Sequence, residues 1–135
     1  VLHGRLPSVG IDCPGVPIVV ARQLGLVPQD WDVTGYTASP DGKLTDWLDA
    51  MMPRTRHPQP GDVQVWRWGP GRPQHVGILV PYMGRSDVMA AVHALGPGSP
   101  AVVQYTRLLP GMTPVATYVM PGVHGFTSER VQASA

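Results

Sequence analysis

The chain has few charged residues, one cysteine and no long apolar run, and each shortage excludes a class of protein. Only 14% of its 135 residues are charged and the formal net charge is +1, so we expect neither a nucleic-acid footprint nor a basic membrane-binding patch. A single cysteine excludes a disulfide within this chain, so the fold does not depend on an oxidising compartment. No apolar run approaches the ~20 residues that span a bilayer, so we expect no membrane insertion.

The remaining composition is that of a globular domain built from short elements. Hydrophobic residues make up 43% of the chain, and sixteen prolines and sixteen glycines imply many turns. We expect one domain over residues 1–122, long enough to bury a core, and a tail or linker over residues 123–135. Because the first residue is not methionine, we also expect a fragment or processed piece of a longer protein.

The first half of the chain predicts helices. Valines and leucines recur at helical spacing over residues 13–24, Pro14 suits a first turn, and Gly25 is a good stop. Pro17 would lie beyond the first turn of this helix, so we expect that turn to be irregular or tightly wound. Residues 43–52 predict a short amphipathic helix.

Between the two helices, residues 26–42 read as a surface loop anchored by Trp31 and Tyr36. The second half of the chain predicts strands, because β-forming residues alternate with polar ones between turn signals. The expected strands are residues 63–68, 75–82, 87–95, 101–109 and 115–120, the first two forming a hairpin. Residues 87–95 also fit a helix, but their place between two turn-rich segments favours a strand. The predicted fold class is α+β, with helices first and an antiparallel sheet second.

Cys13 stands at the predicted start of the first helix. A cysteine attacks as the thiolate, and its ordinary pKa of about 8.5 must fall for it to work near neutrality. The free amides and the dipole of a helix N-terminus favour negative charge, and an adjacent imidazole does the same. These amides also suit the binding of an oxyanion.

Two of the five histidines are candidates for that imidazole. His75 opens a predicted strand directly after a turn, and His93 lies in the next strand. If these strands pair antiparallel, the two rings share one end of the sheet, where His93 can hold the second ring nitrogen of His75 and fix its tautomer.

Each candidate also has a purely structural interpretation. A lone cysteine in an apolar helix is usually a packing residue, His75 can be a half-buried strand-edge residue, and His93 can be a core histidine. Trp66 and Trp68 are best explained by sheet packing, and Asp62 by a turn. A zinc site is not expected, because the histidines show neither an H-E-x-x-H pattern nor close spacing to the cysteine.

Four motifs in order point to one family. They are Asp12-Cys13-Pro14-Gly15-Val16 at a helix start, "PGDVQVWRW" from residue 60, His-Val-Gly-Ile from residue 75, and "VHA" at 92–94. Together they resemble the NlpC family of papain-like cysteine peptidases, which cleave peptides of the bacterial cell wall. The resemblance covers about residues 4–120 and implies the papain-like NlpC fold, in which the helix carrying the cysteine packs on a small antiparallel sheet.

The resemblance also implies roles for four residues. Cys13 would be the nucleophile, His75 the general base and His93 the orienting residue, and Asp12 would support the local backbone. The implied activity is that of a cysteine endopeptidase on the peptidoglycan stem peptide, next to D-glutamate and a diamino acid, with no cofactor and no metal.

"HGRLPSVGIDCPGV" and "RWGPGRPQHVGIL" are similar to the branch of this family that tailed phages and gene-transfer particles encode. That branch implies a place at the virion tail tip beside other tail-tip proteins, and action in the bacterial periplasm or cell wall.

Two departures from the family pattern keep other functions open. Pro14 stands where the family usually has serine, which removes a hydroxyl and a backbone donor, and the family's upstream tyrosine would precede Val1. One alternative is therefore a structural tail-tip domain that has little or no activity. Another is a related amidase or acyltransferase, because the same three residues serve several acyl transfers.

Overall fold

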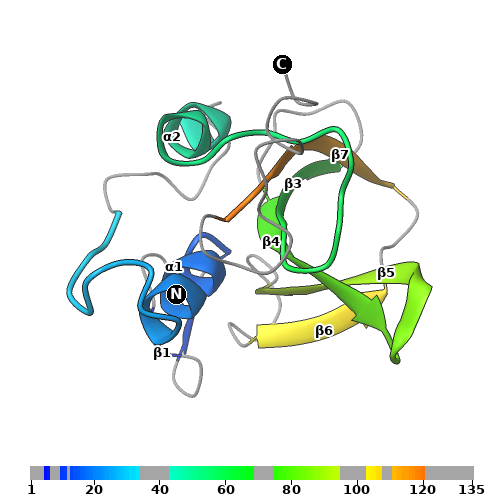
Figure 1. Ribbon diagram of the computed structural model, residues 1–135, viewed down its shortest axis with the longest axis horizontal. Helices are drawn as coiled ribbons and strands as arrows, with labels where there is room; N and C mark the ends of the chain where they lie inside the picture. Colours follow the sequence, from blue (N-terminus) through cyan, green and yellow to red (C-terminus); the bar gives the residue numbers. More distant parts are fainter. Residues whose placement is uncertain are drawn as a thin grey trace.

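The computed structural model describes residues 5–6, 10–11, 13–33, 43–68, 75–94, 103–107 and 111–120 and has the predicted α+β organisation (Figure 1). Along the chain the elements are β1 (Arg5–Leu6), β2 (Gly10–Ile11), α1 (Gly15–Gln23), α2 (Lys43–Met51), β3 (Val63–Trp68), β4 (His75–Tyr82), β5 (Arg85–Ala94), β6 (Val103–Arg107) and β7 (Met112–Tyr118). The predicted tail and Tyr36 lie outside the described residues.

Five strands form one antiparallel sheet in the order β6-β5-β4-β3-β7. The hairpin predicted from residues 63–68 and 75–82 is present as β3 and β4, and β5 pairs with β4 as an antiparallel neighbour. The strand preferred for residues 87–95 is confirmed, but it begins at Arg85. Met83 and Gly84 both have positive φ, of 49° and 77°, so a tight two-residue turn reverses the chain earlier than the sequence suggested.

The last strand begins earlier than predicted, at Met112 instead of residue 115, and includes Pro114. A proline cannot donate to a neighbouring strand, so it is confined to sheet edges and irregular positions. β7 is such an edge strand, and its register with β3 shifts between Val65 and Trp66, close to the pairing of Trp66 with Pro114.

The two faces of the sheet pack against different partners. Val63, Val65, Val76 and Ile78 belong to a core cluster that includes residues of both helices, and we call this side of the sheet the helix-side face. The alternate residues point the other way, where Trp66, Leu79, Ala91 and Met112 form a second buried cluster on what we call the inner face. This period of two is why alternation in the sequence predicted the strands.

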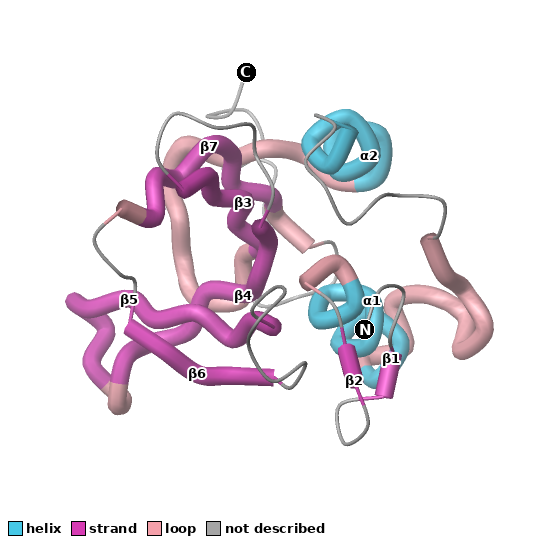
Figure 2. Tube along the Cα trace, turned by 180° about the vertical axis from the view of Figure 1, so that it is seen from behind, coloured by secondary structure: helices cyan, strands magenta, loops and turns pink. Residues whose placement is uncertain are grey.

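Both helices lie on the same side of the sheet, and the sheet itself is bent. Figures 1 and 2 show β3 and β7 on one side of β4, and β5 and β6 on the other. The bend lets Met112 of β7 share a buried cluster with Ala91 of β5, although β3 and β4 lie between their strands. No helix among the described residues is long and apolar enough to cross a membrane.

The first helix begins two residues later than predicted, which changes the role of Pro17. α1 starts at Gly15, so Pro17 is its third residue and lies inside the first turn. Backbone N–H groups in that turn have no partner within a helix, so Pro17 removes no helical hydrogen bond. The reason for expecting an irregular first turn, a hydrogen bond lost at Pro17, was therefore wrong.

Candidate active site

The structure brings His75 and His93 into direct contact. Their strands are adjacent and antiparallel, and Nε2 of His75 lies 2.6 Å from Nδ1 of His93. The ring centroids are 4.9 Å apart and the planes cross at 71°, so the contact is made edge to edge by nitrogen atoms and not by stacking. The expectation that the two rings share one end of the sheet is confirmed.

Burial keeps this histidine pair neutral at ordinary pH. His75 is 5% exposed and His93 is fully buried. Loss of hydration, together with the nearby His93, lowers the pKa of His75 to about 4, and burial also lowers the pKa of His93. With both rings neutral, one ring donates its N–H and the other accepts the hydrogen bond. The tautomer of one ring therefore determines the tautomer of the other.

Trp66 is the third ring of this site, and its role goes beyond the sheet packing expected from the sequence. It is fully buried and directly opposite His75 in the β3–β4 register. Its ring centroid lies 5.7 Å from that of His75 and 6.4 Å from that of His93. The signal available in the sequence was the predicted hairpin of residues 63–68 and 75–82, because antiparallel pairing of these strands places Trp66 beside His75.

A chain of hydrogen bonds fixes the indole in place. Trp66 Nε1 donates to Gln64 Oε1 at 2.7 Å, and Gln64 Nε2 donates to the Thr117 hydroxyl at 2.9 Å. Gln64 and Thr117 are both buried, so each polar group meets a partner inside the sheet. The flat ring that packs against both imidazoles is therefore held at its polar end as well as by packing.

Gly77 allows β4 and β5 to approach each other closely behind the histidine pair. A Cβ atom at this position would lie 2.8 Å from the carbonyl oxygen of Val92, 2.9 Å from Cβ of His93 and 3.2 Å from the ring of Trp66. Only glycine fits without moving one of these atoms. This gives a physical reason for the glycine in the His-Val-Gly-Ile motif.

Cys13 directly precedes the N-cap of α1, in the position that the sequence predicted. It is half-buried and packs against the helix-side core cluster, which also contains Val76 and Ala94. These two residues follow His75 and His93 in the chain, and α1 contacts both β4 and β5. By strand alternation the rings of His75 and His93 lie on the inner face, whereas Cys13 packs on the helix-side face beside the residues that follow them.

The backbone around the thiol differs from an ordinary helix start. Pro14 is the N-cap residue, with helical angles of −68° and −22°, and it makes no side-chain cap. Pro14 and Pro17 both lack an N–H, so two of the four amides that normally point out of a helix N-terminus are missing. Gly15 and Val16 are the residues of that turn that can donate. The N-terminal end of α1 therefore carries a weaker partial positive charge than that of an ordinary helix.

Asp12 and Asp62 are the other residues that the sequence analysis singled out. Asp12, expected to support the backbone beside the nucleophile, lies outside the described residues. Asp62 is a buried turn residue, as predicted, and its carboxylate accepts the backbone N–H of Gln59 at 2.8 Å. Across the described parts of the chain, no three His, Cys, Asp or Glu side chains gather as a metal-ligand set.

The histidine pair can serve acid–base chemistry through one specific ring atom. When His75 donates from Nε2 to His93, proton exchange with another group goes through Nδ1 of His75. If His75 gains a second proton, Nδ1 of the neutral His93 still accepts the N–H of the resulting imidazolium. The second ring thus supports both protonation states of the first.

Comparison of the chain with protein-family models, with curated protein sequences and with solved structures finds no significant match. The resemblance to the NlpC family therefore rests on its four motifs alone.

Proposed function

We propose that the chain is a papain-like NlpC-type cysteine peptidase that cleaves an amide bond in the peptidoglycan stem peptide, as a component of a phage tail tip. The observation that carries this proposal is the contact between His75 Nε2 and His93 Nδ1 at 2.6 Å. A base whose second nitrogen is held by a fixed partner is what a nucleophilic cysteine needs, and the four ordered motifs supply the family and the substrate.

The proposed reaction uses three residues. The Cys13 thiolate attacks the amide carbonyl, and its sulfur forms a thioester as the C–N bond breaks. His75 gives its proton to the departing amine and then takes one from water, which hydrolyses the thioester and restores the thiol. His93 acts as a positioning residue, because it touches His75 and holds its tautomer. Burial disfavours a lone His75 imidazolium, so the charged ring depends on a thiolate beside it.

The first test is the rate at which iodoacetamide alkylates Cys13 as a function of pH. An imidazole-activated thiolate gives a reactive plateau well below the ordinary thiol pKa of about 8.5, and His75→Ala abolishes it. His57→Ala is the matched control, because His57 is exposed and takes no part in the histidine pair. A profile that follows an ordinary thiol in all three proteins would overturn the proposal.

The second test is hydrolysis of the substrate itself. The protein is incubated with a stem peptide that contains D-glutamate and a diamino acid, and cleavage is followed by the appearance of a new amino group. Cys13→Ala should abolish cleavage, and His93→Gln should lower kcat more than it changes KM, because the amide can replace the hydrogen bond but not the ring.

A structural tail-tip domain without turnover is the second candidate. The observation that favours it is the pair of prolines at the start of α1, which removes two backbone donors from the turn nearest Cys13. This candidate predicts an ordinary thiol and no stem-peptide cleavage, together with stable binding to neighbouring tail-tip proteins.

A further inference from the structure

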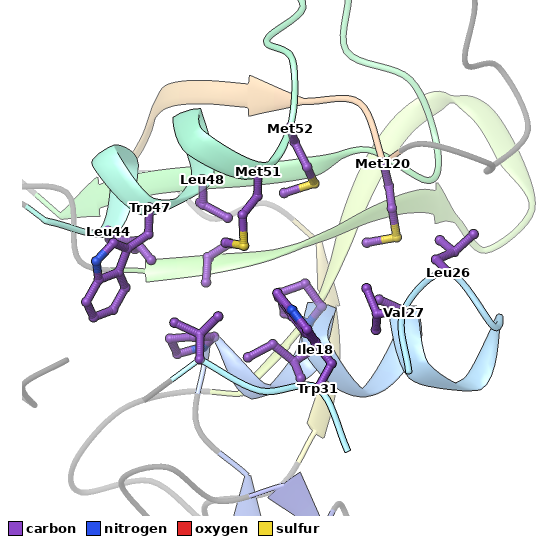
Figure 3. A pocket seen from close by; sticks show the side chains of 15 residues that line it. Ile18, Leu26, Val27, Trp31, Leu44, Trp47, Leu48, Met51, Met52 and Met120 are labelled. Carbon is purple, nitrogen blue, oxygen red and sulfur yellow. The ribbon is translucent and has the colours of Figure 1, made fainter. Parts of the chain in front are cut away.

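An apolar pocket of about 300 Å³ lies between α1, α2 and the segment of residues 26–33. In Figure 3, Leu44 and Trp47 of α2 stand at one end, and Leu26 and Val27 stand at the other. Every described lining residue is aliphatic, proline, methionine or tryptophan, and none is charged. The pocket thus offers surface for hydrophobic contact and little for hydrogen bonding.

The pocket follows the whole length of α1. Pro14 lines it at the N-cap of the helix, Ile18 and Ala21 line it in the middle, and Leu26 lies beyond the C-terminal end. At ~1.5 Å per residue the helix gives the pocket a floor roughly 14 Å long. A space of this length, with no charged residue in its described lining, suits an extended aliphatic chain better than a compact polar group.

Polar contacts outside the lining hold both walls of the pocket in place. On α2, Asp49 Oδ1 and the carbonyl of Thr45 accept hydrogen bonds from the hydroxyl of Tyr118, at 2.9 and 3.3 Å. On the opposite wall, Arg22 Nε donates to the carbonyl of Trp31 at 2.7 Å. These anchors tie each wall to α1 or to the sheet, so the space between them is part of the fold.

One end of the pocket lies at the start of α1, next to Cys13 in the chain. Pro14, which directly follows Cys13, lines the pocket, and so does Val76, whose side chain lies on the helix-side face and not on the face of the His75 ring. D-glutamate and a diamino acid carry charged groups that this lining cannot satisfy. A stem peptide therefore does not account for the pocket.

We propose that this pocket binds an unbranched aliphatic chain whose polar end lies at the N-terminal end of α1, beside Cys13. A methylene occupies about the volume of a water molecule, roughly 30 Å³, so the pocket holds roughly ten carbons. A long-chain acyl thioester bound in this way places its carbonyl next to the thiol. The Cys13 thiolate would then form a new thioester as the C–S bond of the bound thioester breaks, and the displaced thiolate would leave as a thiol after taking the proton that Cys13 had released. Only this last step rests on the proposed function, because chain binding needs no catalysis.

The binding test uses a series of 1-alkanols from hexanol to dodecanol, titrated calorimetrically into the wild-type protein and into Cys13→Ala. We expect affinity to rise about fourfold per methylene and to level off near ten carbons, equally in both proteins. Absence of binding, or a rise without a limit as in partitioning, would overturn the proposal and mean that the chain's own residues fill the space.

Two variants test the location of the bound chain. Ala21→Leu enlarges the floor of the pocket and should shorten the longest accepted alkanol by about three carbons. Met51→Trp fills the rim and should weaken binding, whereas Leu24→Trp, at an exposed position outside the described lining, should not. Circular dichroism checks that each variant is folded. Equal binding by all folded variants would place the chain elsewhere and overturn the proposal.

The orientation is tested with N-alkyl iodoacetamides, in which the Cys13 sulfur displaces iodide and forms an S–C bond. The decyl reagent should alkylate Cys13 at least about tenfold faster than the butyl reagent at equal low concentration, and Met51→Trp should abolish the difference. Equal rates, with alkanol binding intact, would overturn the placement of the polar end beside Cys13. Loss of stem-peptide cleavage with chain binding intact would instead overturn the proposed peptidase function alone.

Discussion

Nε2 of His75 lies 2.6 Å from Nδ1 of His93, and this one contact connects the fold to the proposed chemistry. It exists because β4 and β5 pair antiparallel and because Gly77 lets the strands approach beneath the rings. Trp66 then closes the site from β3, with its indole N–H bonded to Gln64. Two neutral rings in a nearly closed environment hold their tautomers, but they cannot easily take up a proton.

The histidine pair should make the protein less stable at acidic pH. The folded-state pKa of His75 is about 4, below its ordinary value of about 6.5. Below about pH 6.5 the unfolded chain binds a proton at this histidine, whereas the folded chain does not. The free energy of unfolding is therefore highest above that pH and falls as the pH drops towards 4. The expected loss is about 3 kcal/mol from His75, and the lowered pKa of His93 acts in the same direction.

Urea unfolding at about pH 7.5 and about pH 4.5 measures this loss. In His75→Gln the side chain no longer titrates but can still donate to His93, so the difference between the two pH values should shrink by more than half. His57→Gln, at an exposed site, should behave like the wild type. An unchanged pH dependence in His75→Gln would show that the ring is solvated in the folded protein.

Gly77→Ala should destabilise the sheet at the site. The new Cβ atom would meet the Val92 carbonyl oxygen at 2.8 Å and Cβ of His93 at 2.9 Å, and these atoms are fixed by strand pairing. We expect a cost of about 2–4 kcal/mol in the free energy of unfolding, together with slower alkylation of Cys13.

Gly25→Ala is the comparison that separates collision from conformational strain. Gly25 has a φ of 71° and nothing within 4 Å of an added Cβ, so alanine there should cost only about 1–2 kcal/mol. If Gly77→Ala cost no more than Gly25→Ala, the close approach of β4 and β5 would not be a real constraint.

Much of this arrangement could be predicted from local sequence. Val63 and Val65 alternate with Gln64 and Trp66, and this period of two predicts a strand without any knowledge of its neighbours. The contact between the two histidines was also within reach, because a hairpin connection makes consecutive strands adjacent. The position of Cys13 at a helix start followed from Pro14 and the valine spacing.

The features that were missed depend on residues far apart in the chain. Tyr118 bonds to Asp49 across 69 positions, and Gln64 bonds to Thr117 across 53. No local pattern reports the pairing of β7 with β3, which brings Gln64 and Thr117 together, or the packing of α2 beside β7, which brings Asp49 to Tyr118. The pocket along α1 could not be predicted from local sequence for the same reason, because its walls come from α1, α2 and Met120, which lie in separate parts of the chain.

Tyr118→Phe should loosen α2 without disturbing the core. The ring of Tyr118 is fully buried, and its hydroxyl bonds to Asp49 and to the carbonyl of Thr45, so the variant keeps the packing and loses only the link. Burial, with the hydrogen bond to Asp49, raises the pKa of Tyr118 to about 12, so the lost group is a neutral hydroxyl at all ordinary pH values. We expect a cost of about 1–2 kcal/mol by thermal or urea unfolding.

Arg54→Ala is the matched comparison for Tyr118→Phe. Arg54 binds the same carboxylate, with Nε 2.6 Å from Oδ1 of Asp49, but both side chains are more than 40% exposed, at 46% and 41%. Solvent screening limits such a pair to about 0–1 kcal/mol, so Arg54→Ala should cost less than Tyr118→Phe. The reverse order would mean that the ion pair, and not the buried hydroxyl, holds α2 on the sheet.

Pro14→Ser should make Cys13 more reactive. The substitution adds a backbone N–H and a hydroxyl at the N-cap of α1, directly beside the thiol, where Pro14 and Pro17 now leave two donors missing. Extra donors at a helix N-terminus stabilise nearby negative charge by about 0.3–1 kcal/mol, so alkylation near neutral pH should speed up by about two- to fivefold. Pro28→Ser, at an exposed turn, controls for the general effect of replacing a proline.

Stem-peptide cleavage should rise in Pro14→Ser as well, since the same donors would face the oxyanion of the tetrahedral intermediate. Equal reactivity of Pro14→Ser and Pro28→Ser would show that the start of α1 does not act on the thiol, and would favour the structural tail-tip domain.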